Sequence, residues 1–151
     1  MRSLIFVALL LGCSMQPDPQ DVEGVGTSED GIFRTLDLEG VKADKGYAVS
    51  RAVVRLRFAG GSVVEDPVAR TIELNRASST EPVRFRFYLR VAESDGGSKV
   101  EIFCPIDELD ESPGEDTKDP WVPRRERYAQ LENDVLHAIW DELMVRPMGN
   151  S

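Results

Sequence analysis

The sequence has little of what catalytic and metal sites are built from. Its 151 residues contain one histidine, His137, and two cysteines, Cys13 and Cys104. A zinc site usually draws on several histidine or cysteine ligands, and a serine or cysteine hydrolase needs a histidine base. Either kind of site would therefore depend on His137 alone. We expect no metal, no cofactor and no enzymatic activity.

Positive charge and long apolar runs are also scarce. Lysine and arginine together number 18 against 27 acidic residues, which gives a net charge of -9. Nucleic-acid binding requires basic groups for the phosphates, so we expect no nucleic-acid partner. The longest apolar run, residues 4–11, reaches about 12 Å as a helix, whereas a bilayer needs ~20 residues. This run is too short to be a transmembrane helix.

The N-terminus instead has the form of a secretory signal. Arg2 precedes the apolar run, and small Gly12 follows it, directly before Cys13. A positive leader, a short apolar core and a small-residue exit are typical of a signal peptide that is removed. The segment Leu10-Leu11-Gly12-Cys13 resembles the lipobox of bacterial lipoproteins. The alternatives are an ordinary cleaved signal, with Cys13 incidental, and a cytosolic N-terminus that happens to be apolar.

The lipoprotein resemblance implies that residues 1–12 are a signal peptide and that Cys13 is lipidated. Cys13 would become the first residue and carry a diacylglycerol and an N-acyl chain such as palmitate. Two or three acyl chains hold a protein stably on a membrane, whereas one holds it only marginally. Ser14 is not the aspartate that retains many such proteins at the inner membrane. We therefore expect the outer membrane, with the protein facing the periplasm, and keep the inner membrane as the alternative.

The remaining chain divides into a linker, one domain and a tail. Residues 13–31 comprise the lipidated cysteine and a segment rich in proline and glycine, which predicts a flexible linker. Residues 32–146 have the size and apolar content of a single domain, and residues 147–151 form a tail. With Cys13 acylated, Cys104 has no disulfide partner within the chain. Its apolar surroundings predict a buried thiol.

Alternation of apolar and polar residues predicts an antiparallel sheet. This period is typical of strands with one buried face. The clearest case is residues 83–91, where Phe85, Phe87 and Leu89 alternate with arginines and a tyrosine. Turns rich in glycine, proline or polar residues separate the predicted strands, which are residues 32–38, 47–58, 63–64, 68–74, 83–91 and 100–106.

A single long helix is predicted at the C-terminus, over residues 124–145. Apolar residues recur there at helical spacing, from Tyr128 and Leu131 to Leu143. The sequence thus predicts an α+β fold in which this helix packs on an antiparallel β-meander of five or six strands. A β-sandwich with the C-terminal helix as an appendage is the alternative. The two differ in what covers the Phe85 and Phe87 face.

An arginine face is the main candidate binding site. In the predicted strands, arginines alternate with the buried residues, and neighbouring strands would place them on one surface. Guanidinium groups suit carboxylate and phosphate ligands, so this surface could bind an acidic protein or another anionic component of the envelope. The alternative is cross-strand ion pairing with Asp37, Glu73 or Glu101. The face comprises Arg51, Arg55, Arg57, Arg84, Arg86 and Arg90.

Four other features are weaker candidates. The acidic segment 107–119 does not have the spacing of a calcium loop, and we expect a solvated loop. His137 lies between Asp134 and Asp141 at helical spacing and is expected on a charged helix face. Trp140 belongs to the helix stripe, whereas Trp121 could be a contact residue or could pack at the helix start.

These observations favour a cell-envelope lipoprotein that is not an enzyme. It would be anchored to the membrane and would act as an interaction or assembly module, with an envelope protein or an anionic envelope component as partner. A periplasmic carrier of an apolar or lipid ligand is the first alternative, and an envelope hydrolase is the second. A filled core would favour the module, and a large internal cavity would favour the carrier.

Overall fold

The computed structural model describes residues 24–112, 114–116 and 118–145. The predicted signal peptide, Cys13 and the tail 147–151 lie outside these residues. In chain order the elements are β1 (Val25–Thr27), β2 (Arg34–Glu39), α1 (Ala43–Arg57), β3 (Val63–Asp66), β4 (Thr71–Ala77), β5 (Val83–Ser94), β6 (Gly97–Phe103), β7 (Pro105–Leu109), β8 (Trp121–Arg127), α2 (Ala129–Trp140) and a π-helical turn, η1 (Asp141–Val145).

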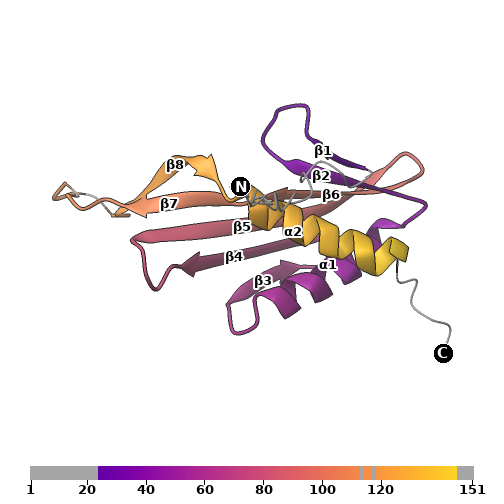
Figure 1. Cartoon of the computed structure of the whole chain (residues 1–151), viewed down its shortest axis with the longest axis horizontal. Helices are drawn as coiled ribbons and strands as arrows, with labels where there is room; N and C mark the ends of the chain where they lie inside the picture. Colours follow the sequence, from indigo (N-terminus) through magenta and orange to yellow (C-terminus); the bar gives the residue numbers. More distant parts are fainter. Residues whose placement is uncertain (1–23, 113, 117, 146–151) are drawn as a thin grey trace, which may run out of the picture.

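The strands form one open antiparallel sheet in the order β1-β2-β6-β5-β4-β3. β5 is the longest strand, and its C-terminal part pairs with β6. Its first residues pair with β7, which follows β6 after Cys104, and β8 pairs with β7. The strands β7 and β8 consequently extend to one side, beyond the helices (Figure 1). The α+β fold with an antiparallel sheet is therefore confirmed.

Both helices lie on the same face of the sheet (Figure 1). Alternate residues of the central strands, among them Phe87, Leu89 and Ile102, are buried against them in one hydrophobic core. Val54 of α1 and Ile139 of α2 are fully buried in the same core. Helices and not a second sheet cover the Phe85 and Phe87 face, so within the described residues the β-sandwich alternative is wrong. No helix in this part of the chain is long and apolar enough to cross a membrane.

The predicted strand over residues 47–58 is wrong, because α1 occupies this position. The alternation would place Leu56 inside with Val54 and Phe58, but Leu56 has 84% of its surface exposed. The buried stripe of α1 follows helical spacing instead, but it includes Gly46 and Ser50, which add no apolar signal. Gly46 is buried where an added Cβ would lie 3.3 Å from Val91, so this small residue brings the helix close to the sheet.

The C-terminal helix is present but shorter than predicted, because residues 121–127 form β8 and α2 begins only at Ala129. Residues 124–127 contribute no apolar residue to the helix stripe, and as a strand they pair with β7. The acidic segment 107–119 is also corrected, since β7 extends to Leu109. At the other end of the chain, the predicted linker 13–31 contains β1, which pairs with β2.

Candidate functional site

The predicted arginine face does not exist as one surface. Arg51, Arg55 and Arg57 lie on α1. Arg84, Arg86 and Arg90 lie on β5, where they alternate with the residues that pack beneath the helices. Side chains alternate across a strand, so these three arginines are on the opposite face of the sheet, which we call the open face. The prediction of one arginine surface is wrong because it requires residues 47–58 to form a strand, whereas residues 47–57 belong to α1.

Each of the six arginines is paired with a carboxylate. Arg51 and Arg55 share Glu65 at 2.7 and 2.6 Å, and Arg57 lies 2.9 Å from Asp134. The hydrogen bond from Arg55, followed by the charge of Arg51, lowers the pKa of Glu65. Of the expected cross-strand partners, Glu101 pairs with Arg90, whereas Asp37 pairs with Lys99. The arginines are mostly neutralised rather than available to an anionic partner.

A buried carboxylate organises two of the open-face arginines. Asp107 of β7 lies opposite Arg84 of β5, and its side chain is almost fully buried. Arg84 and Arg86 both reach it, with Nε atoms 2.9 and 3.0 Å from Oδ2. The Arg84 guanidinium also lies over the ring of Trp121, 4.9 Å from its centre. Trp121 thus packs against Arg84 at the start of β8, and not at the start of α2, which begins at Ala129.

An aromatic cluster lies beside these arginines on the open face. Tyr88 and Phe103 are cross-strand neighbours, and the Phe33 ring lies 5.9 and 6.0 Å from their rings. Arg90 is placed with its guanidinium 4.9 Å from the centre of Phe33 while it pairs with Glu101. All three rings are only partly buried. A sheet face that faced only water would be expected to carry polar residues here.

A shallow groove of about 370 Å³ borders the aromatic cluster. Val64 of the edge strand β3 forms part of its wall and has 67% of its surface exposed. The groove and the cluster are continuous through Tyr88 and Phe103. We call this surface the open-face patch; it comprises Phe33, Val64, Arg86, Tyr88, Arg90 and Phe103.

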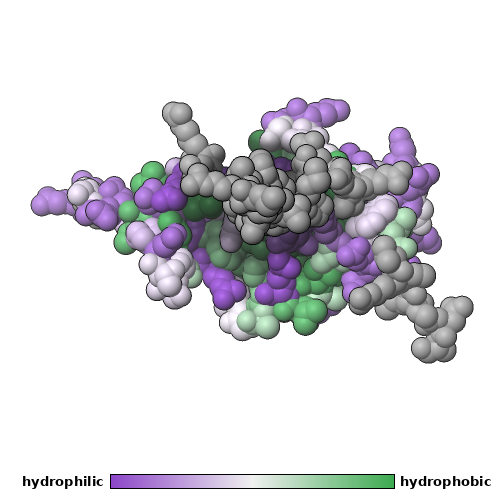
Figure 2. Space-filling model, viewed as in Figure 1, coloured by the Kyte–Doolittle hydropathy of each residue, from purple (hydrophilic) through white to green (hydrophobic). Residues whose placement is uncertain are grey.

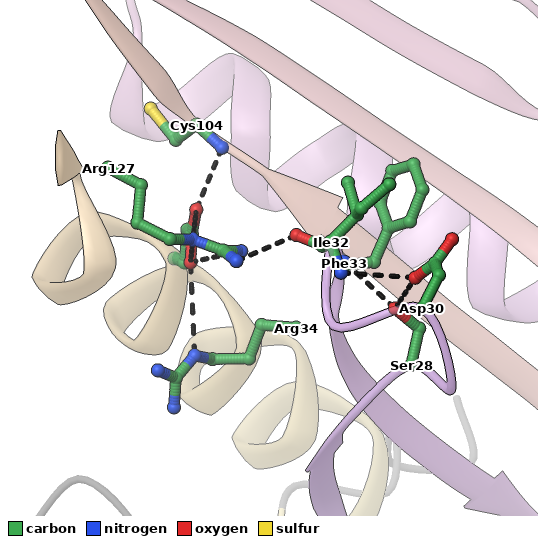
Figure 3. Close-up of polar contacts among 8 residues, drawn as sticks. Ser28, Asp30, Ile32, Phe33, Arg34, Cys104 and Arg127 are labelled. Carbon is green, nitrogen blue, oxygen red and sulfur yellow. Dashed lines mark hydrogen bonds and ion pairs between the residues drawn. The ribbon is translucent and has the colours of Figure 1, made fainter. Parts of the chain in front are cut away.

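The turn between β1 and β2 holds Phe33 in the patch. The Phe33 amide donates to Ser28 Oγ at 2.9 Å, and the Ile32 amide donates to Asp30 Oδ1 at 3.0 Å (Figure 3). The Ser28 hydroxyl also donates to Asp30, and this hydrogen bond is the main reason that the pKa of Asp30 is lowered. These local bonds fix the backbone of the turn, so Phe33 is presented in a defined position.

A second buried carboxylate, Glu132 of α2, connects this turn to the core. Arg127 Nε and the amide of Cys104 donate to Glu132 Oε1 at 2.9 and 2.8 Å. Arg127 Nη1 donates to the carbonyl of Ile32 at 2.7 Å, and Arg34 lies 3.8 Å from Glu132 (Figure 3). Sequence reasoning missed Glu132, because a single glutamate in a helix gives no signal of burial.

Cys104 is fully buried, as predicted. Burial, aided by the charge of Glu132, raises the pKa of its thiol from the ordinary 9.0 to about 12. The thiol is therefore protonated at neutral pH. A thiolate is the reactive form, so this cysteine is chemically inert in the folded protein.

The pKa of Cys104 predicts a loss of stability in alkali. Above pH 9 the unfolded chain releases the thiol proton while the folded chain retains it up to about pH 12. The free energy of unfolding should therefore fall with rising pH in this window, by up to about 1.4 kcal/mol per pH unit from this group. Urea denaturation between pH 8 and 11 measures this slope. A Cys104→Ala variant should be less stable overall, but its free energy of unfolding should fall less steeply with rising pH. An identical slope would contradict the prediction.

The remaining chemical groups that the sequence singles out are His137 and the carboxylates beside it. His137 lies on α2, and its Nε2 atom is buried without a hydrogen-bond partner in this part of the chain. Its neighbour Asp134 is engaged by Arg57 and Gln130. No group of three or more potential metal ligands occurs among the residues described. No protein-family model and no curated protein matches the chain.

Proposed function

We propose that this protein is a membrane-anchored lipoprotein of the cell envelope that acts as a non-enzymatic interaction or assembly module. Cys13 would carry the lipid anchor, and the chain up to residue 23 would link it to the domain. The protein would face the periplasm from the outer membrane. The open-face patch would contact the partner.

The open-face patch is the observation that supports this proposal. The two helices cover one face of the sheet, so the patch stays accessible on the other. Aromatic residues and arginine are enriched in protein interfaces and supply much of their binding energy. In the patch, three aromatic side chains and two arginines are adjacent. The side chains between helices and sheet form one buried hydrophobic core, which favours an interaction surface over a carrier cavity within that core.

The pairing of the arginines favours a protein partner over an anionic glycan or headgroup. Arg86 is held by Asp107 and Arg90 by Glu101, so their charges are largely compensated. A partner could therefore contact the flat side of each guanidinium and the rings of Phe33, Tyr88 and Phe103. Planar groups of this kind pack well against the apolar and aromatic side chains of another protein.

The anchor is tested separately from the patch. Mass spectrometry of protein isolated from its native host should show an N-terminal Cys13 that carries acyl chains, without residues 1–12. A bare Cys13 or an intact leader would overturn the lipoprotein assignment. Neither result depends on the open-face patch, so the two parts of the proposal can fail independently.

A charge placed in the groove should abolish partner binding without unfolding the domain. Val64 is exposed in the groove, so Val64→Glu should be tolerated in the free protein but should bury an unpaired carboxylate in the complex. We expect retention of the envelope partner to fall at least about tenfold. Val68→Glu is the matched control, because Val68 is 91% exposed and lies in the turn after β3, outside the groove. Retention is measured by quantitative pull-down from solubilised envelopes, and equal losses for both variants would contradict the role of the patch.

Reversing the charge of both Arg84 and Arg86 would be a poor test of the open face. Both arginines neutralise the buried Asp107, so reversal would place three carboxylates together and destabilise the fold. Val64 makes no ion pair and avoids this problem.

A further inference from the structure

A second cavity lies on the helix-bearing face, at the end of the sheet that the helices do not cover. It is a cleft of about 530 Å³ formed by the β4–β5 hairpin, β7, β8 and the start of α2. Its volume falls within the ~300–1,000 Å³ typical of small-molecule sites. Figure 2 shows apolar surface next to hydrophilic side chains at this end of the molecule. We call it the end cleft, and it is lined by Arg76, Glu81, Val83, Phe85, Ile106 and Tyr128.

The floor and one wall of the end cleft are apolar. Phe85 and Ile106 are cross-strand neighbours, and both are only partly buried. The Tyr128 ring stands against Phe85 with 6.0 Å between ring centres, and Tyr128 is 45% exposed. These residues continue the hydrophobic core beyond Phe58, which directly follows α1 and packs against Phe85. An apolar ligand would therefore extend an existing core.

Arg76 adds a positive charge at the edge of this floor. It lies directly opposite Phe85 in the β4–β5 pair. Among the arginines whose side chains the structure describes, it alone has no carboxylate partner. The partnered arginines are Arg34, Arg51, Arg55, Arg57, Arg70, Arg84, Arg86, Arg90, Arg124 and Arg127.

We propose that the end cleft binds a singly charged amphiphile, a fatty acyl chain with one anionic head group. The chain would pack on Phe85, Ile106 and Tyr128, and the head group would pair with Arg76. A guanidinium binds a carboxylate or phosphate oxygen pair in a bidentate manner, which suits this role. Arg124, also at the cleft, is engaged by Glu108 at 2.9 Å, and Glu81 contributes a negative charge at the rim. Multiply charged anions are thereby disfavoured.

The end cleft and the open-face patch are on opposite faces of the sheet, so this proposal does not depend on the proposed interaction. The two can fail separately: Val64→Glu leaves the end cleft intact, and Arg76→Gln leaves the patch intact. The anionic head group has two possible sources, a free fatty acid or an anionic lipid within a bilayer. The experiment below distinguishes them.

Isothermal titration of the full chain, with Cys13→Ser in all samples, tests the proposal with decanoate below its micelle-forming concentration. We expect decanoate to bind and decyltrimethylammonium, a cation with the same chain length, to bind at least about tenfold more weakly. Arg76→Gln should weaken decanoate binding about tenfold, since the charged hydrogen bonds to the head group are lost. Arg51→Gln on α1 is the matched control and should leave the affinity unchanged.

Vesicles of phosphatidylglycerol and phosphatidylcholine identify the source of the head group. If Arg76→Gln also lowers retention on phosphatidylglycerol vesicles, the cleft takes a bilayer lipid; if only decanoate binding falls, it takes a free fatty acid. All samples carry the same N-terminal segment, so binding through that segment cancels in the comparison. Absence of decanoate binding, or equal affinity of Arg76→Gln and the unsubstituted chain for decanoate, would overturn the proposal.

Discussion

Replacing Glu132 with alanine is expected to lower the free energy of unfolding by about 3–5 kcal/mol. The Glu132 side chain is fully buried and compensates the charges of Arg127 and Arg34. It also accepts the amide hydrogen of Cys104. Alanine would leave an arginine charge in a partly buried site and a buried amide without its partner. The loss would be a large fraction of the ~5–15 kcal/mol stability of a typical domain.

Urea denaturation followed by circular dichroism measures this change. Glu39→Ala is the matched control, because Glu39 lies exposed on β2. We expect the control to change the stability by less than about 0.5 kcal/mol. Glu132→Gln should fall between the two, since its amide oxygen can still accept from Cys104. If the Glu132→Ala and Glu39→Ala variants were equally stable, the ion pairs of Glu132 with Arg127 and Arg34 would not stabilise the fold.

Replacing Asp107 with alanine is expected to cost about 2–3 kcal/mol. Asp107 is buried and accepts hydrogen bonds from Arg84 and Arg86, which are partly exposed. Its loss would leave two adjacent guanidiniums without their common partner, at the place where β7 joins β5. Because these arginines can turn partly towards water, the cost should be smaller than for Glu132.

Asp119→Ala is the control for Asp107, because Asp119 pairs with the same arginine from an exposed position. Its carboxylate lies 3.4 Å from Arg84, and 63% of its side chain is exposed. Exposed ion pairs contribute ~0–1 kcal/mol, so this variant should be nearly as stable as the unsubstituted chain. Thermal and urea unfolding compare the two. Equal destabilisation by Asp107→Ala and Asp119→Ala would show that burial of Asp107 is not what stabilises the β5–β7 junction.

The central strands could be predicted from the sequence because burial acts on alternate residues there. Phe87, Leu89, Val100 and Ile102 point to the helices and are buried as the alternation predicts. The same rule failed for α1, whose buried stripe contains Gly46 and Ser50 and whose Leu56 is exposed. A helix that packs closely on a sheet needs small residues at the contact, and these weaken the periodic signal.

The open-face patch could be predicted only in part. The sequence predicts that Arg86, Tyr88 and Arg90 share one face of β5, because these residues alternate with the buried ones. Phe33 could not be assigned to the patch, since its position depends on the Ser28–Asp30 turn and on the contact of Arg127 with Ile32. The sequence predicts a loop at Asp107 for a similar reason. Its role arises only when β7 pairs with β5, which composition cannot reveal.

The most direct test of the proposed function is site-specific photocrosslinking in intact cells of the native host. A photoreactive residue at Val64, which is 67% exposed, lies in the open-face patch, whereas one at Val68, which is 91% exposed, lies outside the groove. We predict one dominant envelope-protein adduct from position 64 and none from position 68. Indistinguishable adducts from both positions, or no protein adduct from position 64, would contradict an interaction through the open face.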